Sequence, residues 1–350
     1  MGELDIMKIF HVFLTTIIAV GVTAFAFSSQ AEVLSGPQVV KVAESAYQWT
    51  GVAVSPGGRV FVKYPTWNDH PDFKVAELVR DKAVPFPSQA DNKKFICVQS
   101  VVADAKDHLW ILDPAKLRGQ AVDPSGAKLF QVSLKDNTIN RTYIFPKTVA
   151  LDQSYMNDVR IDRQGTYAYL TDSGVGGIIV LDLQSGQSWR ALSDIPEVKA
   201  NLKSIDFITT GPMTRLSQSD GIELSPDDKL LYFTALGGDR LHAVPTWILR
   251  DRNMSVANRQ AFIDTVNMHN VPTDGMILRQ GRLYMADLPV EGLWEFDVTT
   301  RQGRVLPVGQ ALRWADSFAN APDGSIYFTT SQINYPVEKR QTYKLYRLIL

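Results

Sequence analysis

The sequence predicts an all-β fold, a six-bladed β-propeller with four antiparallel strands in each blade. A unit made of a polar residue, a short alternating strand, a turn and a second strand rich in β-formers recurs along the 350 residues. The turns lie about 45 to 65 residues apart, a period typical of propeller blades. The six copies span residues 49–62, 99–113, 157–171, 219–234, 273–286 and 315–329.

Strand-like segments at the two ends of the chain supply a third observation. Gln38–Val42 and Tyr343–Leu348 are both rich in residues that favour strands, such as valine and tyrosine. An open ring of blades would leave exposed strand edges, which proteins avoid. We therefore expect the N- and C-terminal strands to share the last blade and close the ring.

The composition limits the classes of partner. The formal net charge is −1, and no run of basic residues occurs, so neither nucleic acid nor an acidic membrane surface is expected as a partner. The single cysteine, Cys97, lies in an apolar segment and cannot form an intrachain disulfide. We interpret it as a small buried hydrophobic residue.

The N-terminus has the layout of a signal peptide. Lys8 precedes an apolar run over residues 9–27, and the small residues Ser29 and Ala31 suit a cleavage site after residue 31. This predicts a signal peptide at 1–31, a single propeller domain at 32–350, and a secreted or periplasmic protein without stable membrane insertion after cleavage. The alternative is an uncleaved membrane anchor, because the apolar run approaches the length of a spanning helix.

The polar residue that begins each inner strand is the candidate for function. Inner strands line the central channel of a propeller, so these residues converge on one axis. Three carboxylates and an amide gathered there raise one another's pKa values unless a cation, a cationic ligand or a shared proton compensates. If the compensating group is a metal ion, a hard divalent cation with oxygen ligands fits best, and Ca²⁺ is the favoured one because it accepts carboxylate, amide and water oxygens together. The alternative is that these residues form Asx-turns that only satisfy the local backbone.

Further candidate site residues come from the same end of the channel. Asp316 or Asp158 would act as the catalytic base. The loop after the second strand of each blade returns to this face, and the 193–218 segment is long enough to cover it as a lid. The residues predicted to contact a ligand are Trp49, Gln99, Ser100, Trp67, Asp172 and Trp314.

Several motifs carry a family resemblance that covers nearly the whole chain after residue 31. They include Asn157-Asp158-Val159-Arg160, Thr171-Asp172-Ser173-Gly174, Asp220-Gly221-Ile222-Glu223-Leu224-Ser225-Pro226 and Trp314-Ala315-Asp316-Ser317. The sequence resembles a bacterial member of the major royal jelly protein/Yellow family. The resemblance implies a secreted six-bladed propeller that binds small molecules at the channel mouth, with some relatives tied to catechol and amine chemistry.

A more distant resemblance is to the gluconolactonase/regucalcin family, whose six-bladed channel holds a divalent metal. Asn157, Asp220 and Asp274 match three metal positions of that family. The fourth position, a Glu at the start of the first blade, is replaced by Trp49-Thr50-Gly51, which puts the metal and the lactonase activity in question. Asp316 is the residue that would compensate.

These observations leave more than one function open. The first hypothesis is an exported propeller that binds a small polar or aromatic molecule at the channel mouth, with metal-assisted lactone hydrolysis or dopachrome-type isomerisation as its chemistry. The alternative is a non-enzymatic protein whose carboxylates bind an amine directly. A third is a scaffold for protein partners, since propellers often serve that way. The fold alone does not select among these three functions.

Overall fold

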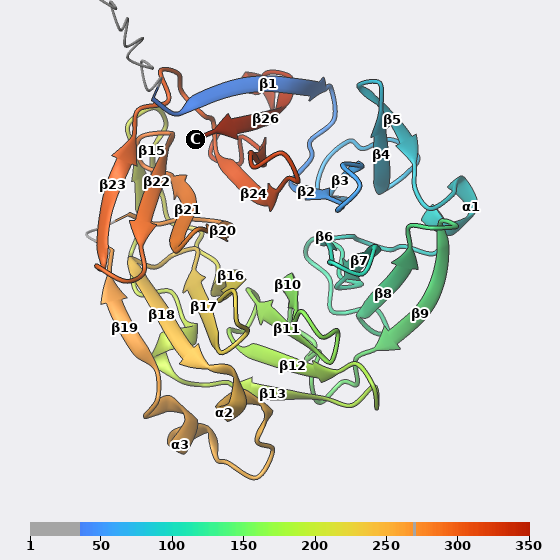
Figure 1. The fold of residues 1–350 in the computed structure, drawn as a ribbon, viewed down its shortest axis with the longest axis vertical. Coiled ribbons are helices and arrows are strands. Elements are labelled where there is room, and N and C mark those ends of the chain that lie inside the picture. Colours follow the sequence, from blue (N-terminus) through green and yellow to red (C-terminus); the bar gives the residue numbers. More distant parts are fainter. Residues whose placement is uncertain (1–35, 269–270) are drawn as a thin grey trace, which may run out of the picture. The chain divides into compact units, whose positions relative to one another are not determined.

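The structure is a computed structural model that describes residues 36–268 and 271–350. These residues form six four-stranded antiparallel sheets and one two-stranded sheet. The six sheets stand in a ring with their first strands toward the centre (Figure 1), which confirms the six-bladed propeller. The predicted signal peptide, residues 1–31, lies outside the described residues. No helix within 36–268 or 271–350 has the length and apolar character needed to cross a membrane.

Five blades are built from strands that follow one another in the sequence. From inner to outer strand, the first two are β2 (Gly51–Val54), β3 (Val60–Lys63), β4 (Val75–Val79) and β5 (Lys82–Pro85), then β6 (Ser100–Ala103), β7 (His108–Asp113), β8 (Lys128–Ser133) and β9 (Thr138–Ile144). The third is β10 (Met156–Ile161), β11 (Tyr167–Asp172), β12 (Ile178–Asp182) and β13 (Ser188–Leu192). The others are β16 (Ser219–Leu224), β17 (Leu230–Ala235), β18 (Arg240–Pro245) and β19 (Asp264–Asn267), then β20 (Met276–Arg279), β21 (Arg282–Asp287), β22 (Gly292–Asp297) and β23 (Gln302–Leu306).

The last blade joins the two ends of the described chain, as the sequence predicts. From inside to outside it contains β24 (Ala315–Asn320), β25 (Ile326–Thr330), β26 (Tyr343–Ile349) and β1 (Gln38–Ser45). The β1–β26 pairing runs from Gln38 opposite Ile349 to Ser45 opposite Tyr343, and the two strands lie side by side in blue and red in Figure 1. This pairing closes the ring.

Short helices and one hairpin lie between or beside the blades. The long 193–218 connection carries β14 and β15, and it reaches the blades of β20–β23 and β24. Phe207 stacks on Trp314 at a ring-centroid distance of 5.5 Å, and Thr209 donates a hydrogen bond of 2.8 Å to Glu291. The hairpin consists of β14 (Ile205–Phe207) and β15 (Gly211–Met213). The short helices are α1 (Gln89–Asn92), α2 (Thr246–Arg250), α3 (Val256–Gln260), η1 (Pro196–Val198) and η2 (Val337–Lys339).

Apolar side chains fill the spaces between adjacent blades. Leu170 and Leu181 of one blade pack in a single buried cluster with Trp110 and Leu112 of the preceding blade. Each blade therefore buries both faces against its neighbours, which fixes its angle around the axis.

The inner strands approach one another closely where they begin. A Cβ atom on Gly221 would lie 2.4 Å from the carbonyl oxygen of Asp274, and one on Gly275 would lie 2.4 Å from that of Asp316. The glycine that follows each aspartate therefore permits the contact between neighbouring inner strands. Pairing with the second strand is also interrupted at this point in β10, β16 and β24, and such β-bulges re-aim side chains.

Removal of Tyr343–Leu350 tests the closure. We expect the melting temperature to fall by at least about 10 °C, because β1 and β25 would each lose a paired strand. Thermal unfolding followed by circular dichroism measures this change. Deletion of the exposed Leu350 alone is the matched control, since this residue follows β26. An unchanged melting temperature in the longer truncation would contradict the closure.

Candidate functional site

Six polar side chains, one from each blade, meet in the half of the channel where the inner strands begin. We call this group the acid layer. Five of its members are buried, with at most 8% of their surface exposed, and Gln99 is half-buried. The acid layer consists of Lys63, Gln99, Asn157, Asp220, Asp274 and Asp316.

Hydrogen bonds connect much of the acid layer around the axis. Lys63 Nζ donates to Gln99 Oε1 at 3.3 Å, and Gln99 Nε2 donates to Asn157 Oδ1 at 2.6 Å. Asn157 Nδ2 in turn donates to Asp220 Oδ1. The structure thus brings together the three predicted metal ligands, Asn157, Asp220 and Asp274, and the predicted base Asp316.

Lys63 reaches the acid layer from the second strand of its blade. Gly51 lies opposite Lys63 in the β2–β3 pairing, and a Cβ atom on Gly51 would lie 2.6 Å from Lys63 Cγ. The missing side chain of Gly51 therefore leaves the path along which Lys63 extends. Burial lowers the pKa of Lys63 to about 8, while the nearby Asp316, Asp274 and Asp158 act in the opposite direction.

The carboxylates of the acid layer hold protons more tightly than exposed carboxylates do. Burial, followed by the nearby Asp274, raises the pKa of Asp220 and of Asp316 well above the usual value. Burial raises the pKa of Asp274 to about 6, against the hydrogen bonds from Trp314 and Asp220. A single lysine therefore balances only part of the negative charge that three ionised aspartates would bring.

Asp316 differs from its neighbours because half of its carboxylate is unsatisfied. Its Oδ2 is buried and, like the Oγ of the adjacent Ser331, forms no hydrogen bond of standard geometry with a described residue, although Ser331 lies close enough to lower the pKa of Asp316. A buried polar atom without a partner costs about 1–3 kcal/mol. In native proteins such an atom is explained by an ordered water, a bound ion or ligand, local strain or a catalytic role.

Two of the predicted ligand-binding aromatic residues contact the acid layer. Trp314 Nε1 donates to Asp274 Oδ2 at 2.6 Å. Trp67 Nε1 donates to the hydroxyl of Tyr155 at 2.9 Å, which donates to Gln99 Oε1 at 2.9 Å. The Trp67 ring also lies 5.5 Å from Lys63 Nζ. The half-buried Trp67 therefore forms an indole edge beside the charges, whereas Trp314 is 1% exposed and packs in the core with its ring stacked on Phe207.

The structure places the predicted residues Trp49 and Asp172 apart from this edge. Trp49 is 1% exposed and packs in the apolar core, with its ring centroid 6.3 Å from that of Tyr64. Asp172 accepts hydrogen bonds from Ser154 and Arg190 at 2.6 and 2.8 Å. Burial would raise its pKa, but these two partners hold it below the usual value. Asp172 therefore holds the loop that follows β11 in place.

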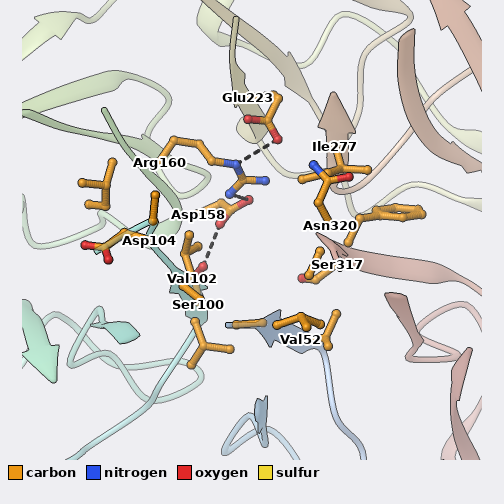
Figure 2. A pocket seen from close by; sticks show the side chains of 18 of the residues that line it. Val52, Ser100, Val102, Asp104, Asp158, Arg160, Glu223, Ile277, Ser317 and Asn320 are labelled. Atoms are coloured by element: carbon orange, nitrogen blue, oxygen red, sulfur yellow. Dashed lines mark hydrogen bonds and ion pairs between the residues drawn. The ribbon is translucent and has the colours of Figure 1, made fainter. Parts of the chain in front are cut away.

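The other two predicted residues, Ser100 and Asp158, belong to a second group deeper in the channel. Ser100 Oγ donates to Asp158 Oδ1 at 2.7 Å, and Arg160 bridges Asp158 and Glu223 with contacts of 2.9 and 3.2 Å (Figure 2). Arg160 also donates to the carbonyl of Met276 at 3.0 Å. We call Asp158, Arg160 and Glu223 the ion bridge.

The residues present fit a metal ion poorly. No three His, Cys, Asp or Glu side chains within the described ranges are grouped in a way that could hold one. The amide oxygen of Asn157 already accepts from Gln99, and the ammonium group of Lys63 lies among the carboxylates. Ca²⁺ binding by Asn157, Asp220 and Asp274 therefore stays a prediction that needs direct measurement.

Sequence reasoning placed Lys63 only in a loop at the rim of the channel, residues 63–71, and did not single out Tyr155, Arg160 or Glu223 as channel residues. Lys63 ends an apolar strand opposite a glycine, where a side chain can turn inward, and this was the available signal. Arg160 and Glu223 lie two or three residues after a polar residue that starts an inner strand. Nothing in the local sequence indicates that the Tyr155 hydroxyl lies between Trp67 and Gln99.

The fold and the charged channel define a six-bladed propeller with a polar central site. Residues 96–301 match the family model described as major royal jelly protein, and the chain belongs to this family. Protein yellow of Drosophila erecta and of Drosophila melanogaster are each 24% identical to this chain in an alignment of 232 residues that covers 59% of this chain. The match spans 43% of the length of these relatives.

Solved propellers share the fold at low sequence identity. A calcium-binding protein, regucalcin, from Agrobacterium tumefaciens has a TM-score of 0.57 and 13% identity, covering 86% of this chain and 90% of its own. A gluconolactonase from Xanthomonas campestris has a TM-score of 0.54 and 14% identity, covering 89% and 88%. Both resemblances inferred from the sequence motifs are thereby confirmed, the second at the level of fold.

The raised pKa of Asp274 predicts a dependence of stability on pH. Its folded pKa of about 6 exceeds the usual 3.8, so its stabilising contribution is complete below pH 3.8 and is lost as the pH rises through 6. We expect Asp274→Asn to remove about 3 kcal/mol of this dependence between pH 4 and 7. Urea unfolding measures it, with the exposed Asp152→Asn as control. An identical pH profile in both variants would contradict the assignment.

Gly51→Ala tests the path of Lys63. We expect a loss of about 1–3 kcal/mol in the free energy of unfolding, because the new methyl group would displace Lys63. Gly36→Ala is the matched control, since no atom lies within 4 Å of its Cβ position. Adding Lys63→Ala should relieve part of the Gly51→Ala loss. Equal unfolding free energies for the two single variants would show that Lys63 does not take this path.

Proposed function

We propose that the protein binds a small polar or aromatic molecule at the acid layer. The observation that carries the proposal is the buried Asp316 Oδ2, which lacks a partner among the described residues and lies in a cluster of three carboxylates and one lysine. Burying charged groups costs several kcal/mol for each ion, so such a cluster is poorly explained by stability. Titratable groups with shifted pKa values that converge in one place are typical of functional sites.

The charges of the acid layer favour a ligand with a cationic or hydroxyl-bearing end. Three aspartates face one ammonium group, so an added positive charge lowers the repulsion among them. The indole ring of the half-buried Trp67, which lies 5.5 Å from Lys63 Nζ, would contact a flat body beside this end. This arrangement supports the non-enzymatic amine-binding alternative as well as an enzyme.

An enzymatic role would use Asp316 as the base. Its Oδ2 is not engaged by a described residue, whereas Asp158 is held by Arg160 and Ser100. A base must reach the proton that it removes, and this condition favours Asp316 over Asp158. The fold shared with a gluconolactonase makes lactone hydrolysis the first activity to assay, followed by dopachrome-type isomerisation.

We also propose that the protein acts outside the cytoplasm. The support is the signal-peptide pattern of residues 1–31. N-terminal sequencing of the exported protein would identify the cleavage site.

Calorimetric titration with dopamine tests the proposal. We expect saturable binding to the wild type and at least tenfold weaker binding to Asp316→Asn and Asp220→Asn, because each variant removes a carboxylate of the acid layer. Asp152→Asn, with an exposed side chain, should bind like the wild type. Binding that is the same in all four proteins would contradict the proposal.

Two further measurements separate binding from catalysis. Titration of the metal-free protein with Ca²⁺, Mn²⁺ and Zn²⁺, with and without Asp220→Ala, decides whether a divalent cation takes part. A pH-stat assay with glucono-δ-lactone then tests turnover. Saturable dopamine binding with neither metal binding nor turnover would identify the protein as an amine binder.

A further inference from the structure

A second compartment lies in the other half of the channel. The structure contains a cavity of about 230 Å³ there, and no member of the acid layer lines it. Its lining includes turn residues that follow the inner strands β6 and β10, among them Lys106 and Arg163, so it opens on the side of these turns. We call this cavity the turn-side pocket.

The ion bridge and Ser100 form the floor of the turn-side pocket (Figure 2). Arg160 donates to Glu223, to Asp158, to the carbonyl of Val159 and to that of Met276. These bonds use four of the five N–H groups of a guanidinium and fix its position. The floor therefore presents one cation and two carboxylates in a rigid arrangement with a net charge of −1.

The charged side chains nearer the opening of the turn-side pocket are each paired with neighbouring groups. Lys106 and Arg163 donate to the backbone carbonyls of Gln164 and Pro226. Asp104 accepts from Trp110 and His108, and Asp162 accepts from the backbone of Thr166. Asp162 also lies 3.7 Å from the guanidinium group of Arg250, which is outside the lining. The unpaired negative charge therefore belongs to the floor, where Asp158 and Glu223 share Arg160.

Apolar side chains surround the space above the floor. Val52, Val102 and Ile277 project into it from three different blades (Figure 2). At about 30 Å³ for each water, the cavity has the volume of about eight water molecules. A pocket with apolar walls and a few fixed polar groups at one end suits a small organic ligand.

We propose that the turn-side pocket is a second binding site, which takes a small organic cation with an apolar body. The ammonium group would lie against Asp158 and Glu223, and the body would lie among Val52, Val102 and Ile277. Because the two carboxylates already share Arg160, a second cation would complete the charge balance of the floor. No residue of the acid layer lines the cavity, so a ligand in it would contact a different set of side chains, although Asp158 is close enough to raise the pKa values of Asp220 and Asp274.

Three probes of one shape test the charge preference by calorimetry. Cyclohexylmethylamine is cationic, cyclohexylmethanol is neutral and cyclohexanecarboxylate is anionic at pH 7. We expect the amine to bind saturably and at least tenfold more tightly than the alcohol, with no binding of the carboxylate. Absence of saturable amine binding to the folded wild type, or equal binding of the anion, would overturn the proposal.

Three variants locate the bound amine. Glu223→Gln removes one floor charge with little change of shape, and Val102→Phe fills the space above the floor; each should weaken amine binding at least tenfold. Asp220→Asn, which alters the acid layer, should leave it unchanged. Near-ultraviolet circular dichroism confirms that each variant is folded. Binding that is lost in Asp220→Asn but kept in Glu223→Gln and Val102→Phe would place the amine at the acid layer and overturn the proposal.

The same variants separate this proposal from that of the preceding subsection. Dopamine carries two hydroxyl groups that the apolar side chains Val52, Val102 and Ile277 would leave without hydrogen-bond partners. Glu223→Gln should therefore bind dopamine like the wild type while losing affinity for cyclohexylmethylamine. Asp220→Asn should lose affinity for dopamine and bind cyclohexylmethylamine like the wild type. Failure of the dopamine titration alone would remove the function proposed for the acid layer and leave the turn-side pocket in place.

Discussion

The pairing of β1 with β26 is the contact on which the rest of the architecture depends. It joins strands separated by almost the whole described chain and completes the sixth blade. Each blade supplies one side chain to the acid layer, so the site exists only when all six inner strands hold their places around the axis. A site assembled in this way is a property of the closed ring.

Close packing of the inner strands produces the unusual chemistry of the channel. Gly221 and Gly275 allow each inner strand to touch the next, which leaves little room for water around the aspartates that precede them. Burial then raises the pKa values of these carboxylates, and mutual repulsion adds to the effect. The buried ammonium group of Lys63 offsets part of the repulsion among these carboxylates. The packing that stabilises the ring therefore also holds buried carboxylates close to one another at its centre, which costs free energy.

The ion bridge divides the channel into two compartments of different character. On one side lies the acid layer, in which Trp314 donates to Asp274, the Trp67 ring lies beside Lys63 and the Oδ2 of Asp316 forms no standard hydrogen bond. On the other side, a fixed and nearly balanced floor faces an apolar cavity. Arg160 connects the two chemically, because it anchors Asp158 beneath the acid layer and Glu223 at the floor of the pocket. Membership of the major royal jelly protein family accounts for the ring, and these side chains give this chain its own channel chemistry.

The sequence by itself determined the number of blades, the closing strands and the end of the channel at which polar residues gather. These features follow from local patterns: strand alternation, turn residues and the repeat of a polar residue before each inner strand. The aspartates at 220, 274 and 316 could be placed together for the same reason.

Only the tertiary structure decided which side chains enter the channel and what each one contacts. Trp49 and Trp314 precede inner strands of adjacent blades and both pack in the core, yet only the Nε1 of Trp314 donates to Asp274. Lys63 enters the channel because a glycine on the neighbouring strand leaves it a path. The orientation of a side chain depends on bulges, strand twist and the volume of neighbours far away in the sequence, and no local pattern records these.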